Sequence, residues 1–367
     1  MQSERTLSNR LHLDLPLLAG LLVLSAIGLL TLYSAGGGAP DLVMRQGLRL
    51  LLAFAVMWAV AQIPPWQLAR WAPWLYALGL ILLLAVLLVG DITQGAQRWI
   101  RVGGFKFQPS EMAKLTVPAM IAYYLAERAL PPSLLRIVIG GMLAVIPTLL
   151  VAKQPDLGTA LLIASAGLFV LFLAGISWRL IAALGILAAA SAPVMWMFMH
   201  AYQRRRVLTF LDPTQDPLGA GYHIIQSEIA IGSGGLYGKG WLNGTQSQLN
   251  FLPERSTDFI FAVFSEEFGL FGVVLLISAY LLVVGRGLYI AGRAQDSFGR
   301  LLAGALILTF FVYVLVNIGM VSGLLPVVGL PLPLISYGGT SLVTVMSAFG
   351  VLMSIHTHRR LLSGTRR

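Results

Sequence analysis

Several carboxylates and cations of this chain stand inside, or at the ends of, segments that are otherwise apolar. Glu111 and Lys114 lie three residues apart in one such segment, so on a helix they share a face and can pair. An ionisable side chain within a lipid-embedded helix costs about 3 kcal/mol or more. The spacing therefore predicts either a mutually neutralising structural pair or part of a functional site.

Further cations gather on the same side of that pair. Arg98, Arg101 and Lys106 lie in RWIRVGGFKFQPSE, and Lys153 stands just before a later apolar segment. Several cations around one carboxylate suit a phosphate or pyrophosphate, whose oxygens accept strong hydrogen bonds from ionised donors. These residues predict a clamp for a phosphate-bearing substrate.

Two aspartates stand where an apolar segment begins. Asp156, in KQPDLGT, has helix N-capping as its alternative role. Asp258 follows FLPERST, where Ser256 and Thr257 compete for the cap. A carboxylate between a water-exposed loop and the membrane is well placed as a general base, provided that burial keeps it basic near neutral pH.

Other polar residues are less informative. Glu266 and Glu267 lie about two turns further along and either line a polar cavity or bond a neighbouring helix; the residues alone do not choose. His223 has no second histidine at ligand spacing, which argues against zinc. SGGLYGK lacks the terminal Ser or Thr of a nucleotide-binding loop.

The composition places these residues in a membrane protein. Of the 367 residues, 57% are hydrophobic and 11% are charged, whereas about a quarter of an average soluble domain is charged. Mean hydropathy is +0.81. These values exclude a water-soluble enzyme, a disordered chain and a coiled coil. The net charge of +10 points to anionic lipid or substrate rather than nucleic acid, and the chain has no cysteine.

Ten segments are long and apolar enough to cross a hydrocarbon core of about 30 Å, which needs about 20 helical residues. The first lacks a small-residue cleavage site, so we expect it to be retained. The segments are Leu15 to Ser34, Gln46 to Ala61, Trp71 to Gly90, Pro109 to Leu125, Ile137 to Ala152, Thr159 to Ala174, Leu180 to Met199, Asp258 to Val284, Leu301 to Val321 and Thr340 to His356.

Lys and Arg are more frequent in the inside loops when the N-terminus is placed inside, so both termini are predicted to be cytoplasmic. The one long hydrophilic segment joins the seventh and eighth spans. We therefore predict an all-α polytopic membrane protein, a single domain over residues 1–367, with a large outside (periplasmic) loop over 200–257. In that loop, Tyr222 to Ile231 predicts an amphipathic helix.

Prolines interrupt the chain before the last span, at Pro326, Pro331 and Pro333, ahead of ISYGGTS. Broken backbone at membrane depth is tolerated only where it is buried in protein or lines a polar cavity. This segment is therefore predicted to lie beside such a cavity.

Six motifs follow one another along nearly the whole chain: GAQRWI (95–100), FQPSE (107–111), QPDLGT (154–159), DPLGAGYHIIQS (216–227), FLPERSTDFIF (251–261) and PLPLISYGG (331–339). In this order they resemble the SEDS family of shape, elongation, division and sporulation proteins. The resemblance implies a peptidoglycan glycosyltransferase of the bacterial inner membrane, with ten membrane helices, that polymerises lipid II into glycan strands during cell elongation.

The same resemblance implies roles for individual residues. Asp258 would be the catalytic base, taking the proton from the 4-hydroxyl of the acceptor sugar. The cations would stabilise charge on the departing undecaprenyl pyrophosphate. The implied substrate-binding residues are Arg98, Arg101, Glu111, Lys114, Lys153 and Asp156.

The resemblance also implies a partner, a class B penicillin-binding protein that supplies the transpeptidase. A divalent cation, Mg²⁺ or Mn²⁺, could assist through the pyrophosphate if Asp156, Glu111 and Asp258 converge in space. The sequence shows no dedicated carboxylate cage, so no cofactor is assigned and the metal is left open.

Two other functions use the same features. A lipid II flippase or transporter also needs intramembrane charges, but transport requires access from both faces, and the polar clusters here fall on the outer half. A non-catalytic scaffold of the elongation machinery explains the apolar spans. It gives no reason for Glu111, Lys114 and Asp258 at the membrane boundary.

Overall fold

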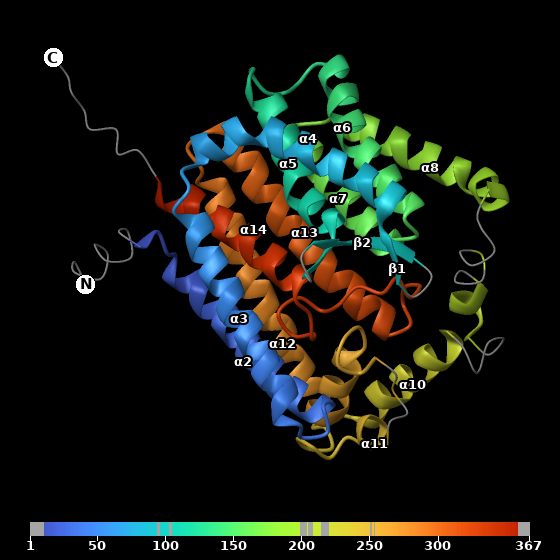
Figure 1. Ribbon diagram of the computed structural model, residues 1–367. Coiled ribbons are helices and arrows are strands. Elements are labelled where there is room, and N and C mark those ends of the chain that lie inside the picture. The colour runs from blue at the N-terminus through green and yellow to red at the C-terminus, as the bar shows by residue number, and fades with distance from the viewer. Residues whose placement is uncertain are drawn as a thin grey trace.

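The computed structural model describes residues 11–93, 96–102, 105–198, 204, 208–213, 220–249, 252 and 254–358. The protein is mostly helical (Figure 1), and each predicted span overlaps one helix, with ends that differ by at most eight residues. These helices are α2 (Leu15–Ala35), α3 (Pro40–Ala61), α4 (Pro65–Val89), α5 (Pro109–Ala126), α6 (Leu134–Lys153), α7 (Leu157–Leu173), α8 (Trp178–Phe198), α12 (Ile260–Gly292), α13 (Ser297–Val321) and α14 (Thr340–Thr357).

Seven of the described helices are long and apolar enough to cross a membrane: α2, α3, α4, α6, α12, α13 and α14. The helix α5 carries Glu111 and Lys114, and α7 has 17 residues. The apolar sequence thus forms long helices. The charged residues Glu111 and Lys114 make α5 less apolar than these seven helices.

Several helices begin at a proline or at a capping aspartate. Proline stands in the first turn of α2, α3, α4 and α5, where its missing N–H would have no helical partner. Asp14, Asp156 and Asp296 precede α2, α7 and α13, and each side chain accepts a backbone N–H of the first turn. Asp156 therefore does cap a helix, in addition to its place in the cavity described below.

The helices form two groups on either side of α13. On one side α2, α3, α12 and α14 pack together, and on the other α4, α5, α6 and α7 do so. The central helix α13 contacts α5, α7, α12 and α14, and it is the most buried of the apolar helices (Figure 1). The two groups therefore meet along α13, which makes its polar residues candidates for a site.

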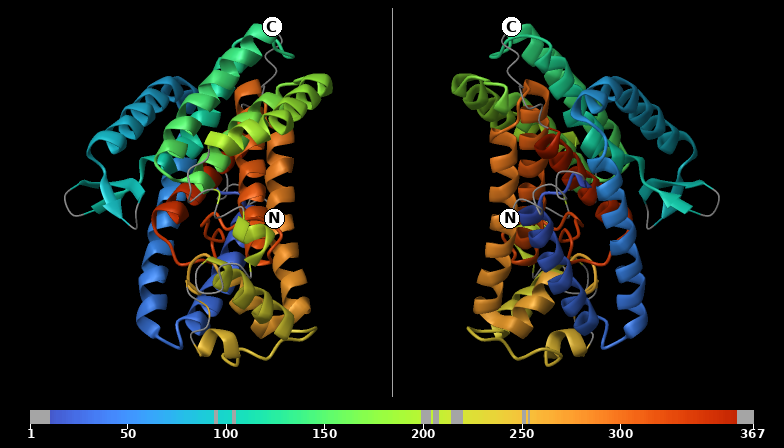
Figure 2. Two further views of the ribbon diagram at one scale, coloured as in Figure 1. Left: turned by 90° about the vertical axis from the view of Figure 1, so that its right-hand side faces the viewer. Right: turned by 90° about the vertical axis from the view of Figure 1, so that its left-hand side faces the viewer.

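A small antiparallel sheet, which the sequence analysis did not predict, lies between α4 and α5. Its strands are β1 (Asp91–Thr93), β2 (Ala96–Val102) and β3 (Phe105–Phe107), in the order β1-β2-β3. Figure 2 shows it at the edge of the molecule beyond the end of α4. Arg98 and Arg101 both lie on β2. Arg98 falls where the pairing of β1 with β2 is irregular, because Asp91 pairs with Trp99 while Ile92 pairs with Gln97.

The predicted amphipathic helix is present as α10 (Ala220–Ser233), followed by the short α11 (Thr245–Gln248). α10 packs against α12 and α13 and buries Ile224, Ser227 and Ala230. Figure 2 shows α10 and α11 at one end of the molecule, beside the start of α12. Of the loop predicted over 200–257, residues 200–203, 205–207, 214–219, 250, 251 and 253 lie outside the described ranges.

The glycine-rich stretch after α10 fills a break in α12. The break falls at Gly269, whose φ of 62° and ψ of −166° are not helical. Four backbone hydrogen bonds join the stretch to the broken helix, from Lys239 N to Glu266 O, Gly240 N to Glu267 O, Leu270 N to Gly235 O and Phe271 N to Leu236 O. The backbone groups that the break exposes are thereby paired, as membrane depth requires.

Candidate active site

A cavity of about 470 Å³ lies where β2, α5, α7, α13 and the loop before α14 meet. The segment that leads into α12 also reaches it. Its polar lining brings together residues from distant parts of the sequence: Arg98, Gln108, Glu111, Asp156, Thr159, Asp258, Tyr313, Thr340 and Ser341. Four of the predicted site residues therefore share one cavity, namely Arg98, Glu111, Asp156 and Asp258.

Asp156 is the centre of a hydrogen-bond network on one wall. Its Oδ1 accepts the backbone N–H of Thr159 at 3.3 Å, and its Oδ2 accepts from Gln108 Nε2 at 2.9 Å. The Arg98 guanidinium is 4.0 Å away and also donates to the carbonyl of Pro155. Asp156 is buried, whereas the Arg98 side chain is 31% exposed. Arg98 is thus held at the wall while a part of it faces the cavity.

Glu111 and Lys114 form the ion pair that their spacing predicted. The Lys114 Nζ lies 2.8 Å from both carboxylate oxygens, and both side chains are buried. Lys114 also lies 5.0 Å from the centre of the Tyr313 ring. An ammonium over an aromatic face is attracted by its negative charge density. The pair is therefore tied to α13 as well as to its own helix.

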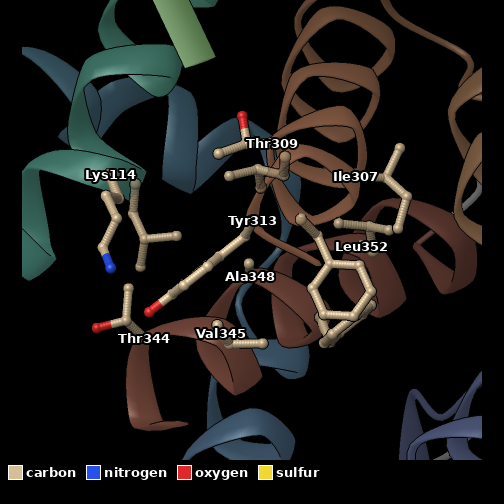
Figure 3. Close-up of a pocket in the computed structure, with 12 residues that line it drawn as sticks. Lys114, Ile307, Thr309, Tyr313, Thr344, Val345, Ala348 and Leu352 are labelled. Atoms are coloured by element: carbon tan, nitrogen blue, oxygen red, sulfur yellow. The ribbon is translucent and has the colours of Figure 1, made fainter. Parts of the chain in front are cut away.

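A second, smaller cavity of about 40 Å³ adjoins the first between α5, α13 and α14. Figure 3 shows Lys114, Tyr313 and Thr344 converging at one end, with the apolar Ile307 and Leu352 toward the other. Tyr313 lines both cavities. Lys114 lines the smaller cavity, and its ion-pair partner Glu111 lines the larger one.

Asp258 lies two residues before α12, in a segment that is pinned to the loop before α14. The carbonyl of Ser256 accepts from Tyr337 N at 2.8 Å, and that of Thr257 accepts from Ser336 Oγ at 2.6 Å. Burial raises the pKa of Asp258 to about 6, and the nearby charge of Glu254 acts in the same direction. This carboxylate is therefore more basic than usual and is ionised at neutral pH.

The proline-interrupted segment lines the cavity, as predicted for broken backbone. Val328 to Pro331 form part of the wall. Gly329 has a φ of 72°, and a Cβ added there would lie 3.4 Å from Asp258 Oδ2. Glycine adopts this left-handed conformation readily. Because it has no side chain, its backbone can lie against the carboxylate of Asp258.

Two predicted cations lie elsewhere. Arg101 is exposed on β2, and Lys153 is exposed at the end of α6; neither lines the cavity. For Lys106, which is in β3, only the backbone is described. Substrate binding by Arg101 and Lys153 stays a prediction.

Glu266 and Glu267 bond neighbouring elements rather than line the cavity. Glu266 lies 2.7 Å from Lys239 and accepts from the backbone N–H of Gln246 at 3.0 Å. Glu267 accepts from the hydroxyl of Ser34 on α2. The two carboxylates thus join the segment between α10 and α12, and also α2, to the break in α12. Of the two roles that the sequence left open, the structure shows bonding to neighbouring elements.

The carboxylates of Asp156, Glu111 and Asp258 share the cavity, which was the condition for metal assistance. Within the described ranges, however, no group of three His, Asp or Glu side chains is placed to hold a metal ion. The ring of His223 stacks on that of Phe259, with 5.7 Å between the ring centres.

Sequence reasoning missed the uncharged polar residues of this region. Tyr313 lines both cavities, and Asn317, one turn further along α13, donates to the carbonyl of Asp258. Both are polar residues inside the apolar segment 301–321. That position is a signal, but a search restricted to charged residues does not detect it. Ser336 and Ser341 lie in the ISYGGTS motif, whose local geometry the sequence does not reveal.

Comparisons with known proteins follow the same motifs. The profile of the FtsW, RodA and SpoVE family, described as cell cycle protein, matches residues 8–361. The chain is 56% identical over 362 residues to the peptidoglycan glycosyltransferase MrdB of Escherichia coli (strain K12), with 98% of each chain covered. It is 33% identical over 423 residues to the peptidoglycan glycosyltransferase RodA of Treponema pallidum (strain Nichols), which covers 94% of this chain and 98% of the relative.

Solved structures resemble the whole fold. A chain from a peptidoglycan synthase complex that coordinates polymerization and crosslinking matches with a TM-score of 0.82 and 32% identity, over 94% of this chain and 97% of the other. The rod shape determining protein RodA of Thermus thermophilus matches with a TM-score of 0.71 and 29% identity, over 94% and 96% of the two chains. The chain therefore belongs to the FtsW, RodA and SpoVE family, the SEDS family that its motifs resemble.

Proposed function

We propose that this protein is a peptidoglycan glycosyltransferase that polymerises lipid II into glycan strands during cell elongation. The observation that carries the proposal is one cavity whose lining includes both a carboxylate of raised pKa, Asp258, and an arginine, Arg98. The relative MrdB, which is named for this activity, is 56% identical over nearly the full length.

Asp258 acts as the general base. Its carboxylate takes the proton from the 4-hydroxyl of the acceptor sugar while that oxygen forms a bond to the anomeric carbon of the donor. The bond from this carbon to the pyrophosphate breaks, and undecaprenyl pyrophosphate leaves with the electron pair. A pKa of about 6 leaves Asp258 ionised at neutral pH and basic enough to accept the proton.

The wall that carries Arg98 stabilises the charge that grows on the leaving group. Arg98 presents its guanidinium to the cavity and is anchored by Asp156 and Pro155. Groups that are held in place before the reaction stabilise developing charge most effectively. Glu111 holds the ammonium of Lys114 beside the cavity. Arg101 and Lys153 lie outside it and would meet only a substrate that extends beyond it.

The protein is a multi-pass protein of the bacterial inner membrane. All ten apolar helices cross the membrane as one domain, with both termini in the cytoplasm and residues 200–257 forming a periplasmic loop between the seventh and eighth spans. The seven long apolar helices and the placement of Lys and Arg in the loops support this topology. α5 accepts charged residues because it lines the site.

The partner is a class B penicillin-binding protein that crosslinks the strands. The similarity to a chain of a peptidoglycan synthase complex, in which polymerization and crosslinking are coordinated, supports this assignment.

The test is reconstitution of the purified protein with its penicillin-binding partner in liposomes that contain labelled lipid II. We expect long glycan strands on gels after delipidation. Translocated but unpolymerised lipid II would instead support a flippase, and neither product would support a scaffold; both results would overturn the proposal.

A further inference from the structure

Asn317 is a completely buried amide on α13, 0% exposed. Its Nδ2 donates to two backbone carbonyls, that of Asp258 at 2.9 Å and that of Leu330 at 2.6 Å. Carbonyl oxygens only accept hydrogen bonds, so the NH₂ of the amide has to face them. Both hydrogens of that group are used.

The two carbonyls belong to two different segments of the cavity wall. Asp258 precedes α12, and Leu330 belongs to the wall formed by Val328 to Pro331. The carboxylate of Asp258 lies against Gly329, the residue before Leu330. By bonding both carbonyls, one side chain fixes the separation of the two backbone segments that enclose the carboxylate.

The oxygen of the Asn317 amide lowers the stability of the fold. Its Oδ1 is buried and has no hydrogen-bond partner among the residues that the structure describes. A buried acceptor without a donor is destabilising, and native proteins contain few of them. An apolar side chain would pack in α13 without this cost, but it would leave the two carbonyls unbonded.

We infer that Asn317 is a positioning residue for Asp258, because its amide holds the carboxylate against the Gly329 backbone and limits its contact with water. This inference rests on the proposed function for the role of Asp258 as a base. Asn317 itself touches neither substrate nor the reacting atoms. The structural consequence is direct: without the amide, the Asp258 segment and the loop separate and water reaches the carboxylate.

The experiment compares N317L, which keeps the shape and removes both donors, with N317S, whose hydroxyl serves at most one carbonyl. S278A is the control, because the Ser278 hydroxyl is exposed and bonds only the carbonyl of Val274 in its own helix. We expect kcat for glycan polymerisation to fall about 10- to 100-fold in N317L, as for misplacement of a reacting group by about 1 Å. The KM for lipid II should change less than about threefold. N317S should be intermediate, and S278A should match the wild type.

A second measurement does not depend on activity. Carbodiimides label protonated carboxyl groups, so labelling of Asp258, followed by mass spectrometry across pH, reports its titration. The wild type should show a midpoint near the pKa of about 6. In N317L and N317S the midpoint should move to lower pH, because hydration favours the charged form.

Each outcome has one meaning. An unchanged midpoint in both variants overturns the inference, whether activity is retained or falls with stability, since a purely structural role would not move the titration. A shifted midpoint in either variant supports it, so N317S carries the test if N317L fails to fold. A shifted midpoint in the variants, together with a wild type that makes no glycan, would refute the proposed function. The positioning of Asp258 by Asn317 would still stand.

Discussion

The Lys114 ammonium lies 2.8 Å from both oxygens of the Glu111 carboxylate, and the two buried side chains meet beside the Tyr313 ring. Glu111 faces the large cavity, and Lys114 faces the small one. The pair is therefore both a structural contact between α5 and α13 and part of the proposed site, and these two roles can be separated.

E111Q leaves the Lys114 ammonium buried beside a neutral amide. Removing one partner of a buried ion pair costs about 3–5 kcal/mol, so E111Q should lower the thermal stability of the purified protein strongly. The double variant E111Q/K114M should recover most of that stability, because it buries no net charge. Thermal unfolding in detergent measures both effects as a double-mutant cycle.

The same variants divide the two roles. If the pair binds substrate, the stable double variant should still fail to polymerise lipid II. A double variant with normal polymerisation would show that the pair is only structural.

The pKa of Asp258 determines the pH dependence. Polymerisation by the wild type should fall as the pH drops through about 6, where the base becomes protonated. The acid limb of the profile of kcat/KM measures this value. An acid limb near pH 4 would show that Asp258 titrates like an ordinary carboxylate or is not the base.

The same shift has a consequence for stability. Because the native state holds the Asp258 proton more tightly than the unfolded chain does, native stability should decrease as the pH rises from about 4 to 6. D258N carries no such charge, so its melting temperature should exceed that of the wild type at pH 7. The difference should shrink toward pH 4. A constant difference would contradict the raised pKa.

Gly238, in the segment between α10 and α11, lies against the backbone at the break in α12. A Cβ there would lie 2.1 Å from the carbonyl oxygen of Glu267, and φ is +78°. G238A should therefore destabilise the protein by more than the roughly 1–2 kcal/mol of the left-handed conformation alone. G285A is the matched control, because a Cβ there has open space inside a helix. Equal melting temperatures for both variants would mean that the loop is not docked in this way.

The two arginines of β2 differ in their place relative to the cavity, since Arg98 lines it and Arg101 does not. R98A should reduce polymerisation by at least about tenfold, since a charge-assisted contact to the leaving group is worth about 1.5–3 kcal/mol. R101A, which removes an exposed side chain that does not line the cavity, should change the rate much less. Rates at saturating lipid II for the two variants, with melting temperatures measured alongside, make the comparison. Equal losses would place the leaving group outside the cavity.

The helices were predictable because long apolar runs have few alternatives in a membrane. The sheet was not, because β1 and β3 have three residues each and glycines interrupt the segment. Charged residues within apolar segments indicated Glu111 and Asp258, but only the fold could show that Arg98 faces the cavity while Arg101 and Lys153 do not. Asn317 was missed because its bonds go to backbone carbonyls that are distant in sequence.

The most direct test of the central claim is glycan polymerisation by D258N with a transpeptidase-inactive partner and purified lipid II. D296N is the control, because Asp296 only caps α13 at a distance from the cavity, and asparagine caps equally well. Polymer from the wild type and from D296N, and none from folded D258N, is the predicted result. Equal polymer from D258N would contradict the assignment of Asp258 as the base.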